Sequence, residues 1–395
     1  MITNQYGKPG IKLFEVGYIQ LFNDFCAVFY VCVVCAFDNV SHMESVAMVL
    51  LAASTLINCY LSNRGLGLIF LWSVAFYGFC LMSIFWAVSV ETSNRLLTYV
   101  IRTMVLAVLM SIYLHDERSV RIVFKSIILG TGILSIRLFM DVSLADLGRA
   151  RLGAASGFNE NYIGMVYIYA STVCLCYVKK SNFYSIVYLF FSVMTLLSGS
   201  RKAFVILLLV VIIFYFSRIK KPSNLLYIIP VGGFVILIIY LVMNNEVLYQ
   251  MMGRRMEGIL FMITGEGDAG RSTLIRKDLI DTGLQQFTEN PIIGYGMNNY
   301  RFMSKYNLYA HNNFIELLVD YGIIGFALYY TLPVVLLYKS CVMWITKTKE
   351  VFISIIFMVI FFVNDYGVVS YYSSIVIIIM VASYRKFVLL DEQTV

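Results

Sequence analysis

The sequence predicts an all-α polytopic membrane protein with about twelve transmembrane helices, and three observations carry this prediction. First, 60% of the 395 residues are hydrophobic and only 13% are charged, whereas soluble domains are about 45–50% apolar and about 25% charged. Second, the apolar stretches are long enough for helices of about 20 residues, the length that crosses a bilayer. Third, they lack the alternating pattern of barrel strands, so a helical bundle is the class that satisfies every backbone group in lipid. These observations exclude a soluble enzyme, a secreted disulfide scaffold and a disordered chain.

Twelve apolar stretches are expected as spans. In chain order they lie near 17–38, 43–61, 66–89, 97–114, 119–140, 160–178, 183–199, 202–217, 225–244, 312–338, 350–364 and 367–384.

The spans divide the chain into spans one to nine within 1–244, a large external loop at 245–311, and spans ten to twelve with a tail at 312–395. Both termini are expected to be cytoplasmic, because fifteen Lys and Arg then lie on the cytoplasmic side against five in the short external loops, as the positive-inside rule requires. The polar N-terminal residues are followed by an apolar run without a small-residue cleavage site, which predicts an uncleaved signal-anchor.

The cysteines and the cations inside spans indicate how the bundle is built. All eight cysteines lie in or beside apolar runs, so disulfides are not expected. Cys32 and Cys35 have the spacing of a metal or redox pair, but no histidine stands beside them, and they are predicted to be buried and apolar. Arg102 and Arg137 fall within predicted spans, so either they face the bundle interior or the span boundaries lie elsewhere.

Arginines on the external side run against the positive-inside pattern. They follow the fifth, seventh and ninth spans, at Arg149 and Arg151, at Arg201, and in the long loop that holds Arg271 and Arg276. An anionic ligand would explain them, because a guanidinium binds phosphate through two parallel N–H groups. Ordinary solvation of a loop is the alternative.

Two short segments place small residues beside a polar side chain at the end of a span. Residues 149–164 lead into the sixth span with Asn161 among glycines and alanines, and residues 197–202 join two spans through Ser-Gly-Ser before Arg201. Small residues allow a ligand or another backbone to approach closely. The alternatives are a helix cap by Asn159 or Asn161 and snorkelling of Arg201 into the headgroups.

Residues 271–287 of the long loop predict an amphipathic helix, because the large apolar residues occupy about half of the helical wheel. Such a helix should lie on the bilayer or over the bundle. Arg276 falls within the apolar arc, which indicates either snorkelling or a specific contact. Asn290 and Pro291 end the helix, and the Gly-Tyr-Gly at 294–296 predicts a flexible turn.

A polar stripe begins at the tenth span. His311 stands at the interface, where a histidine can titrate near neutral pH, and Asn312, Glu316 and Asp320 follow at steps of four. Polar side chains on one side of a membrane helix usually face a cavity or a partner. His311 is therefore a candidate catalytic residue, with a helix cap as its alternative role.

Three marks taken together resemble the O-antigen ligase and polymerase superfamily of bacterial membrane proteins. They are Gly-Phe-Asn-Glu-Asn at 157–161 with Gly164, Ser-Gly-Ser-Arg at 198–201, and the block from Arg271 through Asn-Pro-Ile-Ile-Gly-Tyr-Gly at 290–296 to His311, Asn312 and Gly-Ile-Ile-Gly at 322–325. The resemblance covers roughly residues 150–330. The sequence departs from the family at 159–161, where Asn-Pro-Asn is more frequent, and at Ile275, where an aromatic residue is common.

The resemblance implies a fold like that of lipid-dependent, GT-C-like glycosyltransferases. It also implies a donor glycan carried on undecaprenyl diphosphate, and no nucleotide sugar, cofactor or metal. Arg201 and Arg271 match the essential arginines of the family, and His311 matches its histidine. The implied reaction is attack by a sugar hydroxyl on the anomeric carbon with inversion, in which His311, or alternatively Glu316, takes the proton. Further substrate contacts are expected from Arg276, Arg151, Asn161, Asn312 and Glu316.

Two activities fit this resemblance. A polymerase joins repeat units, and a ligase transfers finished polymer to a lipid A core sugar. Gly-Ser-Arg-Lys-Ala at 199–203 and Tyr-Ala-His-Asn-Asn at 309–313 resemble the polymerases of O-antigen and capsule clusters more closely, and this resemblance favours the polymerase. A flippase or exporter of lipid-linked sugar and a structural scaffold are the alternatives.

The expected partners follow from the same resemblance. They are the undecaprenyl-diphosphate-linked glycan and membrane lipid, with a chain-length regulator and a flippase as further candidates and no nucleic acid. The expected location is the bacterial inner membrane, with the active site facing the periplasm or the exterior.

Overall fold

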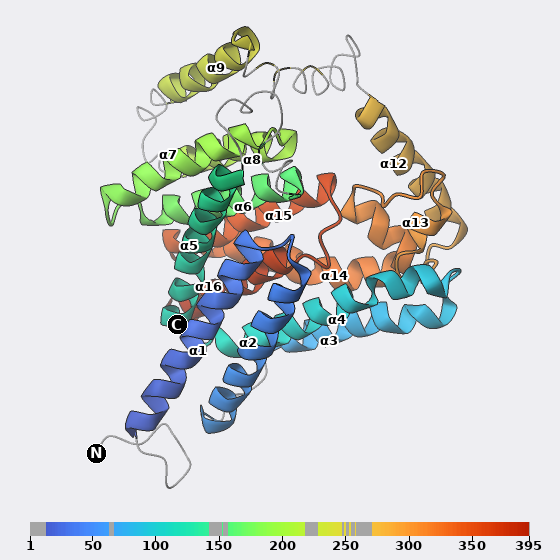
Figure 1. Cartoon of the computed structure of the whole chain (residues 1–395), viewed down its shortest axis with the longest axis horizontal. Coiled ribbons are helices and arrows are strands. Elements are labelled where there is room, and N and C mark those ends of the chain that lie inside the picture. The colour runs from blue at the N-terminus through green and yellow to red at the C-terminus, as the bar shows by residue number, and fades with distance from the viewer. Residues whose placement is uncertain are drawn as a thin grey trace. The chain divides into compact units, whose positions relative to one another are not determined.

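The computed structural model describes residues 13–62, 67–141, 157–217, 228–246 and 271–394, together with Leu152, Tyr249, Gly253 and Glu257. These residues are predominantly helical, and no strand occurs among them (Figure 1). Seven helical segments are long and apolar enough to cross a membrane: Gly17–Ala36, His42–Leu61, Leu68–Trp86, Val90–Tyr113, Glu117–Asp141, Asn313–Thr346 and Lys349–Gly367. Length and composition therefore indicate an all-helical, multi-pass membrane protein, as predicted.

The chain forms two compact units. The first unit comprises Met1–Ser126 and Arg276–Val395, and the second unit comprises Ile127–Ile275. Helix α5 (Glu117–Asp141) begins in the first unit and ends in the second. Helix α12 (Arg271–Glu289) begins in the second unit and ends in the first.

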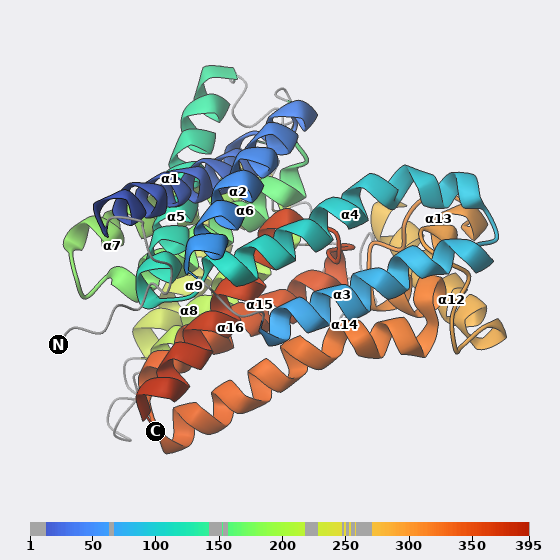
Figure 2. The ribbon, with the colours of Figure 1, turned by 90° about the horizontal axis from the view of Figure 1, so that it is seen from below.

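Each of the other long helices of the first unit packs against one or more neighbouring helices. Helix α1 packs on α2, α3 packs between α4 and α14, and α15 packs between α14 and α16. The side-by-side course of α3, α4 and α14 is visible in both views (Figure 1, Figure 2). The bounds are α1 Leu13–Ala36, α2 Ser41–Ser62, α3 Leu68–Met82, α4 Val90–Tyr113, α13 Asn299–Met303, α14 Asn313–Thr346, α15 Phe352–Gly367 and α16 Ser374–Thr394, with 3₁₀ turns at Ser83–Trp86 and Lys349–Val351.

Aromatic side chains fill the space between α3 and α14. The rings of Phe76 and Tyr329 lie with their centroids 4.8 Å apart, and both residues are fully buried. The Tyr77 hydroxyl donates a hydrogen bond to the carbonyl of Tyr371 at 2.7 Å. The polar ends of buried aromatic rings usually find a partner, and here the partner lies within the bundle, where lipid offers none.

Arg102 of α4 faces the interior of the first unit. Its Nη1 lies 2.9 Å from Oε2 of Glu44 in α2, and its side chain is only 19% exposed. The other carboxylate oxygen of Glu44 accepts hydrogen bonds from Tyr30 at 3.1 Å and from Ser374 at 2.6 Å. A buried charge is tolerated when it is paired and hydrogen-bonded. Of the two sequence interpretations of Arg102, the bundle-facing one is therefore correct.

The second unit contains α6 (Glu160–Tyr177), α7 (Asn182–Leu197), α8 (Arg201–Phe216) and α9 (Ile228–Asn244). Helix α6 packs on α7 and α8, and α8 packs on α9. Arg137 of α5 lies over the ring of Phe158, with 5.1 Å between Cζ and the ring centroid. This cation–π contact supports the bundle-facing interpretation of Arg137 as well.

Each of the twelve predicted stretches overlaps a described helix, although some bounds differ: α4 begins at Val90 and not near 97, and α16 is Ser374–Thr394 where 367–384 was expected. Five of these helices, α6 to α9 and α16, are shorter or more polar than the seven candidate spans. By length and composition, seven of the twelve expected spans are therefore candidate membrane spans among the described residues. Cys32 and Cys35 are buried, as predicted, with 7% and 0% of their surface exposed, and no disulfide forms among the described cysteines.

Candidate functional site

Helix α14 is interrupted at Gly322, inside a candidate membrane span. Gly322 has φ 61° and ψ −167°, a conformation that is essentially restricted to glycine. A Cβ atom at this position would lie 2.3 Å from the carbonyl of Ile292. The break removes neighbouring backbone groups from the helical hydrogen-bond pattern, so those groups need partners from another segment.

The segment 291–296 supplies these partners. Four backbone hydrogen bonds join it to α14: Tyr295 N to Val319 O at 2.9 Å, Gly296 N to Asp320 O at 2.8 Å, Ile323 N to Pro291 O at 2.8 Å and Ile324 N to Ile292 O at 3.3 Å. Gly294 and Gly296 have φ values of 67° and 91° at these close approaches. The Gly-Tyr-Gly at 294–296 forms a bend, and its backbone is bonded to the broken helix.

The carboxylates of Glu316 and Asp320 hold the loop that precedes α14. Asp320 accepts hydrogen bonds from the backbone N–H groups of Asn298 at 2.8 Å and Tyr300 at 2.7 Å. Glu316 accepts one from the N–H of Ala310 at 2.6 Å. Both carboxylates are buried, with 1% or less of their surface exposed. The carboxylates of this polar stripe on α14 thus face the backbone of the folded loop and not an open cavity.

Asp320→Asn should destabilise the folded protein by about 1–3 kcal/mol, because one of the two backbone N–H groups loses its acceptor and remains buried. The measurement is the midpoint of thermal unfolding in detergent. Asp281→Asn, on an exposed carboxylate of α12, is the matched control and should leave the midpoint unchanged. Equal midpoints for the two variants would contradict the role assigned to Asp320.

His311 occupies a constrained position next to the start of α14. Its φ is 53°, in the left-handed region that few residues other than glycine adopt. Its ring lies against that of Tyr309, with 4.0 Å between the centroids. Asn312 caps α14 by accepting hydrogen bonds from the N–H groups of Phe314 at 2.9 Å and Ile315 at 3.2 Å. Strained backbone of this kind persists only where its surroundings hold it, and it concentrates at functional sites.

Two arginines and one carboxylate act electrostatically on Tyr309, whose ring lies against that of His311. Burial and the negative charge of Glu316 raise the pKa of Tyr309, and the positive charges of Arg276 and Arg301 act in the opposite direction. Arg276 is half-buried on α12, so it lies within electrostatic range of the segment that carries His311. Arg301, whose Nε donates a hydrogen bond to the carbonyl of Asn307 at 3.1 Å, was not singled out from the sequence. Its place in the long loop was its only signal.

Helix α12 is present as predicted, and it ends at Glu289. Within the first unit, it packs on the start of α14 through Gly283, where a Cβ atom would lie 2.3 Å from the side chain of Ile315. The Tyr300 hydroxyl donates a hydrogen bond to the carbonyl of Leu279 at 2.7 Å. Leu284, one of the large apolar residues of the predicted amphipathic helix, is 46% exposed. A close approach at a small residue therefore positions this helix.

In the second unit, the N-termini of α6 and α8 meet. Asn159 caps α6 by accepting a hydrogen bond from the N–H of Asn161 at 3.0 Å. Asn161 in turn accepts a hydrogen bond from the hydroxyl of Ser200 at 3.2 Å. Ser200 caps α8 through the N–H of Ala203 at 3.4 Å. Asn159 is therefore the cap of α6, while Asn161 links the two helix ends.

Small residues allow this close contact between α6 and α8. A Cβ atom on Gly164 would lie 2.8 Å from Ala203 and 2.9 Å from both Ser198 and Ser200. Gly199 has a φ of 62°, which turns the chain between α7 and α8. The small residues of both sequence segments thus serve the approach of one backbone to another.

Arg201 extends from the start of α8 to the first turn of α12. Its Nη1 donates a hydrogen bond to the hydroxyl of Thr273 at 3.2 Å, and its Nη2 donates to that of Ser272 at 3.4 Å. The backbone of Arg271 directly precedes Ser272, so the two predicted arginines belong to neighbouring helix starts within the second unit. Each helix N-terminus carries about half a positive charge and attracts anions. This corner can therefore bind a phosphate group. Arg151 lies outside the described residues.

These features define a helical membrane protein with a basic corner at helix N-termini and a strained histidine at the start of a broken span. Residues 186–330 match the sequence model of the family described as O-Antigen ligase. The match confirms the resemblance drawn from the motifs and indicates a function of the O-antigen ligase or polymerase type. Members of this family are glycosyltransferase-like enzymes. No curated protein matches the sequence.

The matched segment contains Arg201, Arg271, Arg276, His311 and Glu316. Among the residues that the structure describes, no three His, Cys, Asp or Glu side chains form a group that could hold a metal ion.

Proposed function

We propose that the protein is a polymerase of O-antigen or another surface polysaccharide. It joins oligosaccharide repeat units carried on undecaprenyl diphosphate by metal-independent, inverting glycosyl transfer on the outer face of the inner membrane. The observation that carries the proposal is the contact of Arg201 with the first turn of α12, within the segment that matches the O-antigen ligase family. Two helix N-termini and two arginines at one corner suit a diphosphate.

In the proposed reaction, a hydroxyl oxygen of the acceptor sugar forms a bond to the anomeric carbon of the donor. The bond from that carbon to the diphosphate oxygen breaks, and the hydroxyl proton goes to His311. Arg201 and Arg271 stabilise the negative charge that develops on the departing diphosphate.

The contacts around His311 favour it over Glu316 as the base. The Glu316 carboxylate already accepts the N–H of Ala310 and is buried, which suits it to hold the loop. Asn312 holds the start of α14 in the same way. Arg276, Asn161 and Arg151 are further proposed substrate contacts.

The proposed fold in the membrane has twelve spans, cytoplasmic termini and one external loop at 245–311, in the manner of lipid-dependent glycosyltransferases. The helices found in all twelve predicted stretches support this arrangement. A chain-length regulator and a flippase are the proposed partners. A ligase that transfers polymer to lipid A core is the second candidate, because the description of the matching family names a ligase.

Deletion of the gene in its own host tests the proposal. For a polymerase, a single repeat unit should remain on its final anchor, and add-back of the wild-type gene should restore the ladder of chain lengths. The measurement is gel separation of surface glycans and of lipid-linked glycans side by side. Accumulation of long polymer on the lipid carrier, with a bare core, would identify a ligase instead.

A transporter is distinguished by a liposome assay with purified protein and lipid-linked repeat unit. A polymerase changes the mass of the labelled lipid, whereas a flippase moves it across the bilayer at constant mass. Movement without any mass change would contradict the proposed transferase.

A further inference from the structure

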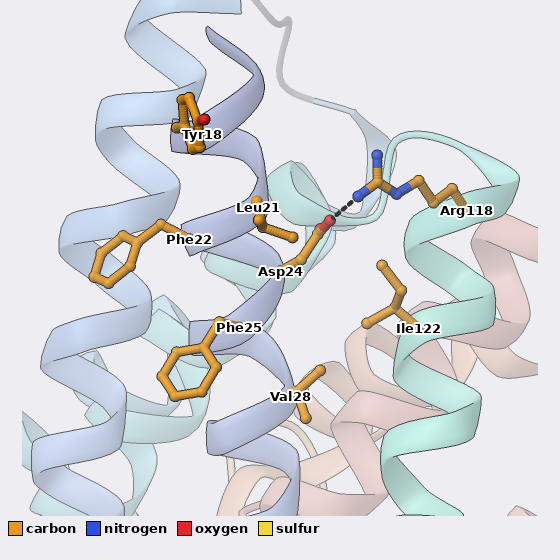
Figure 3. A pocket seen from close by; sticks show the side chains of 8 residues that line it. All are labelled: Tyr18, Leu21, Phe22, Asp24, Phe25, Val28, Arg118 and Ile122. Atoms are coloured by element: carbon orange, nitrogen blue, oxygen red, sulfur yellow. Dashed lines mark hydrogen bonds and ion pairs between the residues drawn. The ribbon is translucent and has the colours of Figure 1, made fainter. Parts of the chain in front are cut away.

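An open cavity of about 630 Å³ lies between α1 and the start of α5 in the first unit (Figure 3). Its volume falls within the range of roughly 300–1,000 Å³ that is typical of small-ligand sites. Apolar side chains of α1 form most of the wall, and they include Leu21 and Phe25, which are 58% and 64% exposed. Both helices are candidate membrane spans, so lipid is the expected surrounding of this wall.

A charged pair closes one part of the cavity. The Nη2 atom of Arg118 on α5 lies 2.6 Å from Oδ2 of Asp24 on α1, and the two side chains are 57% and 7% exposed (Figure 3). The other oxygen of Asp24 accepts a hydrogen bond from the hydroxyl of Tyr113 at 3.0 Å. The carboxylate is thus neutralised within the protein, and more than half of the Arg118 side chain faces outward.

Two further cations continue from Arg118 along α5. Arg121 and Lys125 are both exposed, and their spacing of three and four residues places them on the same helix face as Arg118. The nearest acidic residue on this helix, Glu117, lies 3.6 Å from Lys386 of α16. The carboxylates of Asp24 and Asp116 oppose these three cations, and Asp116 acts electrostatically on Asp24, so one net positive charge remains beside the apolar cavity.

We propose that this cavity binds an anionic glycerophospholipid. An acyl chain lies along the apolar wall of α1, and the phosphate lies against Arg118, Arg121 and Lys125. The charge decides the partner, because a neutral lipid would leave the basic face without a counter-charge, whereas basic pockets between membrane helices suit anionic headgroups. This proposal concerns the first unit alone and does not depend on the proposed transferase activity.

The double variant Arg121→Gln with Lys125→Gln tests the charge contribution and leaves the pair of Asp24 and Arg118 in place. Native mass spectrometry of the purified full chain in detergent measures retention of dioleoyl phosphatidylglycerol against dioleoyl phosphatidylcholine. The wild type should retain the anionic lipid preferentially, and the variant should bind it about 30-fold more weakly. Each Lys or Arg near an anionic headgroup contributes about 1 kcal/mol, and 1.4 kcal/mol is a factor of ten.

Lys179→Gln with Lys180→Gln is the matched control, because it removes two exposed cations elsewhere and should retain the lipid like the wild type. Leu21→Trp tests the cavity without a change of charge and should lower retention by filling the acyl-chain site. Equal retention of the two lipids by the wild type, or equal losses in the control, would overturn the proposal.

Discussion

His311→Asn should lower the rate of glycan transfer about 10²- to 10⁴-fold, the contribution that a general base typically makes, while the protein stays folded. The substitution is chosen for the backbone, because His311 has a φ of 53° and asparagine is among the few residues that tolerate this region. It therefore removes the imidazole and keeps the loop conformation. The measurement is the initial rate with purified protein and lipid-linked repeat unit, together with the thermal unfolding midpoint.

His42→Asn is the matched control, since His42 is exposed on α2. This variant should retain the wild-type rate. The pH dependence gives a second readout. A histidine base must be deprotonated to act, so the wild-type rate should rise with pH, and this rise should be absent in the residual activity of His311→Asn. An unchanged rate, or a loss fully explained by a lower unfolding midpoint, would remove His311 from the mechanism.

The positions of the helices could be predicted because they depend on local pattern. An apolar run of sufficient length in lipid must form a helix to satisfy its own backbone, and every one of the twelve predicted stretches overlaps a described helix. The end of α12 at Glu289 could be predicted for a similarly local reason, since Pro291 cannot continue a helix. Neither conclusion requires knowledge of a distant segment.

The break in α14 could not be predicted, because it depends on residues that are distant in sequence. Gly322 and the segment 291–296 belong together only through backbone hydrogen bonds across the loop. A glycine in an apolar run is compatible with an intact helix, so Gly322 alone carries no sign of the interruption. For the same reason, the family resemblance at 290–296 and 322–325 does not reveal that these two segments bond to each other.

The polar stripe shows a related limit of sequence reasoning. The spacing of Glu316 and Asp320 correctly places them on one helix face, but it cannot distinguish a carboxylate that lines a cavity from one that accepts backbone N–H groups. Those groups belong to Asn298, Tyr300 and Ala310, and backbone donors leave no trace in the side-chain sequence. The structure therefore assigns to these carboxylates a role in holding the loop.

Arg201→Ala should lower the transfer rate about 10²- to 10³-fold, the effect of removing one preorganised group that stabilises developing charge. Arg201→Lys should recover only part of that loss, because an ammonium keeps the charge and lacks the planar fork that binds two oxygens at once. The measurement is the same initial-rate assay. Arg95→Ala, at an exposed arginine of α4, makes the identical chemical change and should keep the wild-type rate.

The hydrogen bonds of Arg201 to Ser272 and Thr273 offer a structural explanation for any such loss, since they join the starts of α8 and α12. The double variant Ser272→Ala with Thr273→Val separates the two explanations, because it removes both hydrogen bonds and leaves the guanidinium in place. If Arg201 acts on the diphosphate, the double variant should retain most of the rate that Arg201→Ala loses. If Arg201 only joins the helices, the two variants should be equally impaired, and the proposed role in leaving-group stabilisation would be wrong.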